Sequence, residues 1–209
     1  MRQRISAAIL VVIGSTMVGC NWIQLGFLLQ EHKRTVPAEF TKLQGQRVLV
    51  FVWAEPETLF DYPHVRWELS SFVGDKLRAE VSGVTVVDPV KVEDHMQKTL
   101  GADADPEHMG KQFEADMVVY LELTEFQIRD PEVPDLVQAR IGASVAVYDL
   151  TADRDEARYH ELAPVHVAEP EGRARIMPRA NMLLIRQEAY LKFAESVARK
   201  FYSWEEIIE

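Results

Sequence analysis

The alternation of apolar and polar residues predicts strands in the second half of the chain. Apolar side chains at every second position from Val137 to Val147 predict a strand with one face turned inward. Asp116 to Ile128 alternates in the same way, but its apolar positions change parity near Thr124-Glu125, which indicates a β-bulge. A weaker strand is expected from Ala157 to Val167, and Pro164 inside it favours the edge of a sheet.

Two further strands are short, continuous apolar runs. Arg47 to Trp53 is apolar and rich in β-branched residues, which is typical of a strand buried on both faces. Val84 to Val87 is the second run, and Asp88-Pro89 ends it. Between them, residues 54–63 contain two prolines and several acids, which predicts a loop.

Apolar residues at three- and four-residue steps predict four helices. They are expected from about Val65 to Val81, around Val92 to Leu100, from Asp105 onward, and from about Met182 to Trp204. Asp105 followed by Pro106 is a typical helix start, because the carboxylate accepts backbone N–H groups of the first turn and proline needs no partner there. The predicted order is therefore β-α-β-α-α-β-β-β-α. It indicates an α/β (α+β) fold with one mixed sheet over residues 46–209.

The first residues have the three parts of a secretory signal. Arg2 and Arg4 form a basic start, and Ala7 to Ile13 form an apolar run that is too short to span a bilayer. Val18-Gly19-Cys20 resembles the bacterial lipobox, in which the cysteine thiol takes a diacylglycerol and the new amino group takes a fatty acid such as palmitate. Residues 1–19 are then a lipoprotein signal peptide and Cys20 is the lipidation site. Its acyl chains would hold the protein stably at a membrane.

Residues 20–45 are predicted to be a tether between the acylated cysteine and the domain. Six apolar residues from Trp22 to Leu29 could lie in the membrane interface or cover part of the domain's own core. In enteric bacteria, an aspartate after the lipidated cysteine retains lipoproteins in the inner membrane. By that resemblance, Asn21 favours the outer membrane, with the domain facing the periplasm.

Composition and charge limit the classes of function that this chain can have. The 209 residues are 47% hydrophobic and 27% charged, which is typical of a globular domain. The formal charge is −10, and loss of Arg2 and Arg4 with the signal would make it −12. Such a chain is poorly suited to nucleic acid, whose binding depends on neutralising phosphates. Because Cys20 is the only cysteine, its acylation would leave no thiol for a disulfide, a zinc site or catalysis.

The order of motifs resembles a known periplasmic fold. The segments that carry the resemblance are Arg47 to Trp53, Val84 to Pro89, Phe113 to Leu123 with its Ala115-Asp116 start, and a terminal helix ending in Phe201-Tyr202. Over residues 46–202 the pattern is similar to the amino-terminal domain of TolB, the curli secretion lipoprotein CsgG and the LpoB-type activators of penicillin-binding proteins. The resemblance implies an envelope adaptor domain. The connections at residues 130–135 and 151–156 are too short for the membrane-crossing hairpins of CsgG, which disfavours a pore.

The sequence contains no recognisable catalytic or metal-binding motif, and we predict neither an enzyme nor a bound cofactor or metal. Ser144 lies outside any GxSxG motif, so a hydrolase is disfavoured. No histidine pair has HExxH spacing. His95 and His108 flank Asp103 and Asp105, but these acids lack the spacing of a calcium loop.

Three groups of residues are candidates for partner binding. Arg173, Arg175 and Arg179 form the one basic cluster, in a segment predicted to be an exposed loop; they could grip a carboxylate-rich partner or simply be solvated. His160 and His166 have an even spacing on the predicted edge strand, so they are expected to share a face. The acids Glu55, Glu57 and Asp61 follow the first strand of the domain and form either a contact surface or a solvated loop.

The leading hypothesis is a non-enzymatic envelope lipoprotein that acts as an adaptor or accessory subunit of a secretion, transport or cell-wall complex. The alternative is a self-assembling ring subunit of a trans-envelope complex, and a hydrolase of lipid or glycan ranks third. The expected partners are the membrane, through the acyl chains on Cys20, and either an envelope protein or further copies of the chain.

Overall fold

The computed structural model describes residues 32–99, 104–129, 136–153, 158–176 and 181–208, which fall into two units. In the smaller unit, β1 (His32–Val36) pairs with β8 (Trp204–Ile208), and Lys33 Nζ lies 3.1 Å from the Glu205 carboxylate. Neither strand is predicted by the sequence pattern. Each is a short segment whose partner among the described residues lies at the other end of the chain, so periodicity within the segment cannot identify it.

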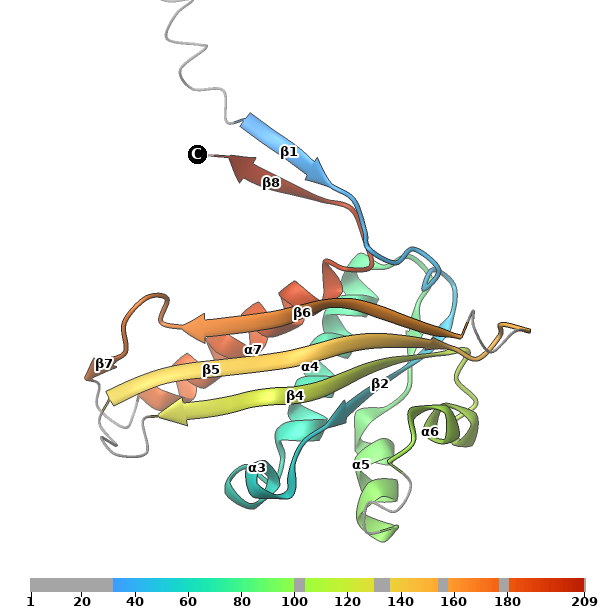
Figure 1. Cartoon of the computed structure of the whole chain (residues 1–209), viewed down its shortest axis with the longest axis horizontal. Helices are drawn as coiled ribbons and strands as arrows, with labels where there is room; N and C mark the ends of the chain where they lie inside the picture. Colours follow the sequence, from blue (N-terminus) through green and yellow to red (C-terminus); the bar gives the residue numbers. More distant parts are fainter. Residues whose placement is uncertain (1–31, 100–103, 130–135, 154–157, 177–180, 209) are drawn as a thin grey trace, which may run out of the picture. The chain divides into compact units, whose positions relative to one another are not determined.

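The larger unit, residues 37–204, is built on a six-stranded mixed sheet (Figure 1). Its strands are β2 (Arg47–Trp53), β3 (Thr85–Val86), β4 (Met117–Arg129), β5 (Leu136–Asp149), β6 (Tyr159–Glu169) and β7 (Arg175–Ile176). The spatial order is β3-β2-β4-β5-β6, and β7 pairs with β5. β2 is parallel to β3 and β4, whereas β4, β5 and β6 are antiparallel. The predicted mixed sheet is therefore confirmed.

Five described helices accompany the sheet: α3 (Pro56–Asp61), α4 (Val65–Glu80), α5 (Pro89–Lys98), α6 (Pro106–Gln112) and α7 (Met182–Ala198). Asp88 and Asp105 cap α5 and α6 by accepting the N–H groups of Val90 and Glu107. α3 lies in a segment that was predicted to be a loop. None of its residues is buried, so the sequence contains no periodic apolar face from which the helix could be predicted. α7 ends six residues earlier than predicted, and Phe201 beyond it still packs in the core.

One face of the sheet is covered by α4 and α7. Inward side chains of β2, β4 and β5 alternate with outward ones and pack against Leu69 and Leu77 of α4 and Phe193 and Val197 of α7. In Figure 1 the strands pass in front of these two helices. This apolar cluster runs almost the whole length of the long strands, from Val147 to Val137 on β5. It supplies most of the buried apolar surface, which is the main driving force for folding.

The opposite face is covered only in part. Leu49, Phe51 and Val118 pack under α5 and α6, together with Met96 and Met109 from those helices. The buried cluster on this side ends at Tyr120 and Tyr148, which are only partly buried. Beyond them, no helix among the described residues contributes to a cluster on this side of β5 and β6. One face of the sheet is therefore covered by helices along its length. The other is covered only under α5 and α6, and we call its uncovered part, on β5 and β6 and the second half of β4, the open half-face.

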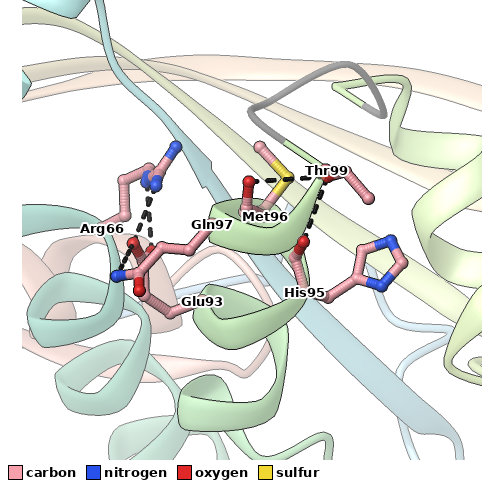
Figure 2. A network of polar contacts seen from close by, with 6 residues as sticks. All are labelled: Arg66, Glu93, His95, Met96, Gln97 and Thr99. Carbon is pink, nitrogen blue, oxygen red and sulfur yellow. Dashed lines mark hydrogen bonds and ion pairs between the residues drawn. The ribbon is translucent and has the colours of Figure 1, made fainter.

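A closed polar network joins α5 to α4 (Figure 2). The Arg66 guanidinium makes two hydrogen bonds to the Glu93 carboxylate, at 3.1 and 2.7 Å, and the Gln97 amide donates a third at 3.2 Å. The side chains of Arg66 and Glu93 are only 15% and 9% exposed. Thr99 donates to the carbonyls of His95 and Met96 where the helix ends. Because both oxygens of this buried carboxylate have hydrogen-bond donors from the protein, the network is best explained as a structural link that positions α5.

The sheet has three register shifts, one of them between Gln127 and Arg129 near the end of β4, and the other two set which side chains face the core. On β4 the pairing with β5 shifts between Leu123 and Glu125, which confirms the bulge predicted near Thr124-Glu125. On β6 the pairing shifts as well: Val165 lies opposite Ala143, whereas Leu162 lies opposite Val145. Two residues of β6 therefore lie opposite one residue of β5. Because of this extra residue, the side chains after Pro164 alternate in the opposite sense between the two faces of the sheet.

Residues 37–45 are part of the domain rather than of a tether. Phe40 and Leu43 are buried in the cluster under α4 and α7, and the Phe40 N–H donates to the Lys200 carbonyl at 2.9 Å. The sequence analysis placed the start of the domain at residue 46 because only two apolar residues in this stretch point inward, without a repeating period. The predicted signal peptide, Cys20 and the first part of the tether lie outside the described residues.

Candidate partner-binding surface

The predicted edge strand is confirmed as an edge, but half of it is already occupied. β6 pairs on one side with β5 and lies at the end of the strand order. Along its first half, Glu39 accepts the backbone N–H of Ala163 at 3.0 Å and also pairs with Lys200 Nζ at 3.0 Å. The chain before β2 therefore protects this part of the edge, as is common for exposed strands. Only the second half of β6, from Val165 onward, remains to pair with another segment.

A hollow of about 660 Å³ lies between that second half of β6 and α7. It is lined by His166, Val167, Ala168, Glu171, Gly172, Leu191, Lys192, Glu195, Ser196 and Arg199. Leu191 is 53% exposed, which is high for a leucine in a helix that packs on a sheet. A strand added to β6 would place alternate side chains over this part of α7, with Leu191 as an apolar contact.

The segment after β6 is held in place at three points. The buried Gln138 amide donates to the carbonyls of Pro170 and Gly172 at 3.0 and 3.3 Å. Lys192 Nζ lies 2.7 and 2.8 Å from the carboxylates of Glu169 and Glu171, and these hydrogen bonds raise the pKa of the ammonium group. Gly172 has φ +85°, a conformation that L residues with a side chain rarely adopt.

β7 then pairs with β5 through Ile176 opposite Leu136 and Arg175 opposite Val137. The segment that was predicted to be a loop therefore contains a short strand. Arg173 and Arg175 are exposed, and Ile176 is 80% exposed beside them. The structure brings these two arginines to an anchored segment next to the hollow, whereas Arg179 lies outside the described residues.

The two predicted histidines do not share a face, so that prediction is wrong. His160 lies opposite Val147, on the side covered by α4 and α7, and its ring is 5.1 Å from Phe40. His166 lies opposite Gly142, on the other side, and its Nδ1 approaches that glycine. The extra residue at Pro164 separates them, because one inserted residue sends every later side chain to the other face. His160 is therefore a half-buried core residue and only His166 is exposed.

Ser144, the serine considered for a hydrolase, and His160 also lie on opposite faces of the sheet. Ser144 lies opposite Glu122 on the open side of the sheet, and His160 points to the covered side. Asp105, considered with His95 and His108, caps α6 instead. No group of three or more potential metal-binding side chains occurs among the described residues.

Two of the acids after β2, Asp61 and Glu55, line two different hollows. Asp61 lines a hollow of about 690 Å³ with Tyr62, Phe126 and Arg186, and Glu55 lines one of about 300 Å³ with Trp53 and Glu122. Sequence reasoning missed both hollows because their walls come from distant elements.

Beside the first of these hollows, the carboxylate of Glu68 accepts hydrogen bonds from Arg186 and from the Tyr190 hydroxyl. Burial and this nearby carboxylate raise the pKa of Tyr190. The only sequence signal for the pair is that Arg186 and Tyr190 are four residues apart on one helix. The described part of the chain contains no helix that is long and apolar enough to cross a membrane.

No protein-family model and no curated protein sequence matches the chain. Among solved structures, a PelC dodecamer from Paraburkholderia phytofirmans is similar, with a TM-score of 0.47 and 11% identity over 83% of this chain and 99% of that chain. The lipoprotein GNA1162 from Neisseria meningitidis gives a TM-score of 0.39 and 18% identity over 70% and 94% of the two chains. The hypothetical protein CT253 from Chlamydia trachomatis gives 0.41 and 12% over 75% and 97%.

Proposed function

We propose that this chain is an envelope lipoprotein, anchored through acyl chains on Cys20, whose αβ domain binds a protein of a secretion, transport or cell-wall complex and catalyses no reaction. The observation that carries the proposal is the sequence Val18-Gly19-Cys20 at the end of a short apolar segment with a basic start. The resemblance of residues 46–202 to the TolB, CsgG and LpoB-type domains supports the adaptor role. Asn21 supports the outer membrane as the site of anchoring.

The surface we assign to the partner is the second half of β6 with the anchored segment that follows it. A strand of the partner would pair with the backbone of β6, and its side chains would lie over the hollow beside Leu191. Arg173 and Arg175 would then bind carboxylates at the end of that strand. Main-chain hydrogen bonds provide affinity in such a complex, and the hollow and the two arginines provide specificity.

The anchor is tested by metabolic labelling of the cells with an alkyne analogue of palmitate. Labelling of the wild-type chain and its loss in Cys20→Ser is the expected result. A wild-type chain that takes no label would overturn the anchor without affecting the assignment of the binding surface.

The surface is tested in cells with a photo-crosslinking amino acid at position 173 or 191, and at Lys98 as a control. Lys98 is exposed at the end of α5, away from β6. One envelope protein captured at positions 173 and 191 but not at 98 supports the adaptor. Adducts between copies of this chain at the same two positions would support the self-assembling subunit instead. Equal capture at all three positions would contradict a specific surface.

A further inference from the structure

The open half-face of the sheet carries a row of aromatic side chains. Tyr120 on β4, Tyr148 on β5 and Tyr159 on β6 follow one another across the strands, with ring centroids 6.1 and 5.3 Å apart. Phe51, on the covered part of this side, continues the row at 5.8 Å from Tyr120. Tyr159 is 49% exposed, so one end of the row is open to solvent. Neighbouring rings meet edge to face, with interplanar angles of 81° and 65°, and an aromatic ring face that no neighbour covers is negatively polarised.

Carboxylates surround this row on the same side of the sheet. Glu122 follows Tyr120 by two residues on β4, and Glu161 follows Tyr159 by two on β6, so each shares the face of its tyrosine. Both glutamates are exposed, and neither makes an ion pair with any described residue. Burial and the charge of Glu122 raise the pKa of Tyr120 to about 12. The rings therefore stay neutral in a negative field.

The hollow of about 300 Å³ extends the same surface toward the end of β2. Trp53 lies opposite Glu122 in the pairing of β2 with β4, so its side chain belongs to this face. The hollow is lined by Trp53, Glu55 and Glu122, together with Thr58, Thr124 and Glu125. Of the three carboxylates, only Glu125 is near a described cation, with Arg140 at 3.9 Å. An aromatic wall with carboxylates beside it is an arrangement that favours an ammonium or guanidinium group.

Beyond Tyr148, β5 presents two small side chains, Ser144 and Ala146, between the glutamates of β4 and β6. Ser144 lies opposite Glu122, and Ala146 lies between Tyr120 and Glu161. Strands are about 4.8 Å apart, and Glu122 and Glu161 are offset by two residues along β5, so their Cα atoms are separated by about 12 Å. That separation is too large for one small cation to contact both. It fits an extended polypeptide that lies along β5 and directs cationic side chains to either side.

We propose that this surface, defined by Trp53, Tyr120, Tyr148, Tyr159, Glu122 and Glu161, binds a segment of a partner protein that carries several lysine or arginine side chains. The aromatic rings would contact the cations face-on, and the unpaired carboxylates would neutralise them. The chain is acidic as a whole, which would attract a basic partner over a longer range. This surface is separate from the β6 edge of the proposed function and depends neither on that edge nor on the lipid anchor.

The test is binding of a fluorescein-labelled octapeptide that repeats Arg-Arg-Ser-Ser, and so carries arginines on both sides of an extended chain, to the full chain in a non-ionic detergent, followed by fluorescence anisotropy. The informative variant is Glu122→Gln with Tyr159→Leu, which removes one charge and one ring without changing side-chain size much. Its matched control is Glu188→Gln with Phe60→Leu. Glu188 is exposed on α7, and Phe60 is 88% exposed on α3.

We expect the informative variant to weaken binding about three- to tenfold, because each cation–π contact or exposed ion pair contributes little by itself. The matched control should change the Kd less than about twofold, because it removes the same charge at a distance. Equal losses in the two variants would reduce the effect to non-specific attraction and overturn the proposal. So would a wild-type chain that does not bind the peptide, or that binds the serine–glutamate counterpart equally well.

Discussion

The two faces of the central sheet differ in what covers them. The face under α4 and α7 is apolar along nearly the whole length of the long strands, and Phe193, Leu121 and Val147 on it are fully buried. The other face is covered by α5 and α6 near β2, and then passes into tyrosines and glutamates. The same alternating strands thus build a folding core on one side and an exposed aromatic and acidic surface on the other. Stability and recognition are therefore expected to separate between the faces, and four predictions test that separation.

The largest effect is expected for Phe193→Ala on the covered face. Removing a fully buried phenylalanine should lower the free energy of unfolding by about 3–5 kcal/mol, because the side chain is lost and a cavity remains. On the open face, Glu122→Gln should change it by less than about 0.5 kcal/mol. Urea unfolding followed by circular dichroism measures both. Similar losses of stability in Phe193→Ala and Glu122→Gln would show that the covered face is no more important for stability than the open face.

The second prediction concerns the network that attaches α5. Glu93→Ala leaves the Arg66 guanidinium without its two hydrogen bonds in a mostly buried position, and should lower stability by about 3 kcal/mol. The double variant Arg66→Met with Glu93→Ala should recover part of that loss, since no unpaired charge remains. Chemical unfolding of the two single variants and the double variant gives the coupling. A double variant whose loss of stability equals the sum of the two single losses would contradict a direct interaction between Arg66 and Glu93.

The third prediction concerns the start of the helix that covers β2. Asp88→Ala removes the carboxylate that accepts the Val90 N–H at 3.0 Å, and should cost about 1 kcal/mol. Glu55 occupies the same position in front of α3 but makes no capping hydrogen bond. Glu55→Ala should therefore leave the melting temperature unchanged while Asp88→Ala lowers it. A larger decrease in Glu55→Ala than in Asp88→Ala would contradict the capping assignment.

The smallest effect is a pH dependence on the open face. Burial, followed by the charge of Glu122, raises the pKa of Tyr120 from 10.0 to about 12. The folded state holds this proton more tightly than the unfolded state, so the contribution is complete below pH 10 and is lost as the pH rises toward 12. The stability of the wild-type chain should therefore fall more steeply between these values than that of Tyr120→Phe. Urea unfolding at pH 9, 10 and 11 measures the difference.

A control comes from Glu122→Gln, which should make the pH dependence shallower without abolishing it. Glu122 contributes to the raised pKa of Tyr120, but burial contributes more. Parallel curves for the wild-type chain and Tyr120→Phe would show that the phenol is not perturbed by folding.

Periodicity alone predicted the main elements of the larger unit and their order. Val137 to Val147 alternates in the sequence and is the inward row of β5 in the structure. The change of parity near Thr124-Glu125 is visible in the sequence because the apolar residues themselves switch sides. Asp105-Pro106 was predicted as a helix start and caps α6, whereas Asp88-Pro89, predicted only as the end of a strand, also caps α5. These features depend on neighbours in the sequence, so they can be predicted without a tertiary structure.

The candidate surfaces were harder to predict because they depend on pairings between distant residues. His160 and His166 have an even spacing, but the register against β5 places them on opposite faces. Arg173 and Arg175 were predicted as exposed, yet their anchoring by Gln138 and Lys192 joins residues far apart in the chain. The tyrosine row combines three strands, and no single segment shows it.

The sequence by itself determined the class of fold, the start of α6 and the buried rows of the long strands. Each of these is a property of a local period or a local motif. Only the tertiary structure decided which edge is protected by Glu39, which histidine is buried, and where the sheet is left uncovered. The physical reason is that α5 and α6 are short and pack over β2, β4 and the end of β5, so they do not extend over the rest of β5 or over β6. Coverage depends on how elements pack in space, which a one-dimensional pattern does not contain.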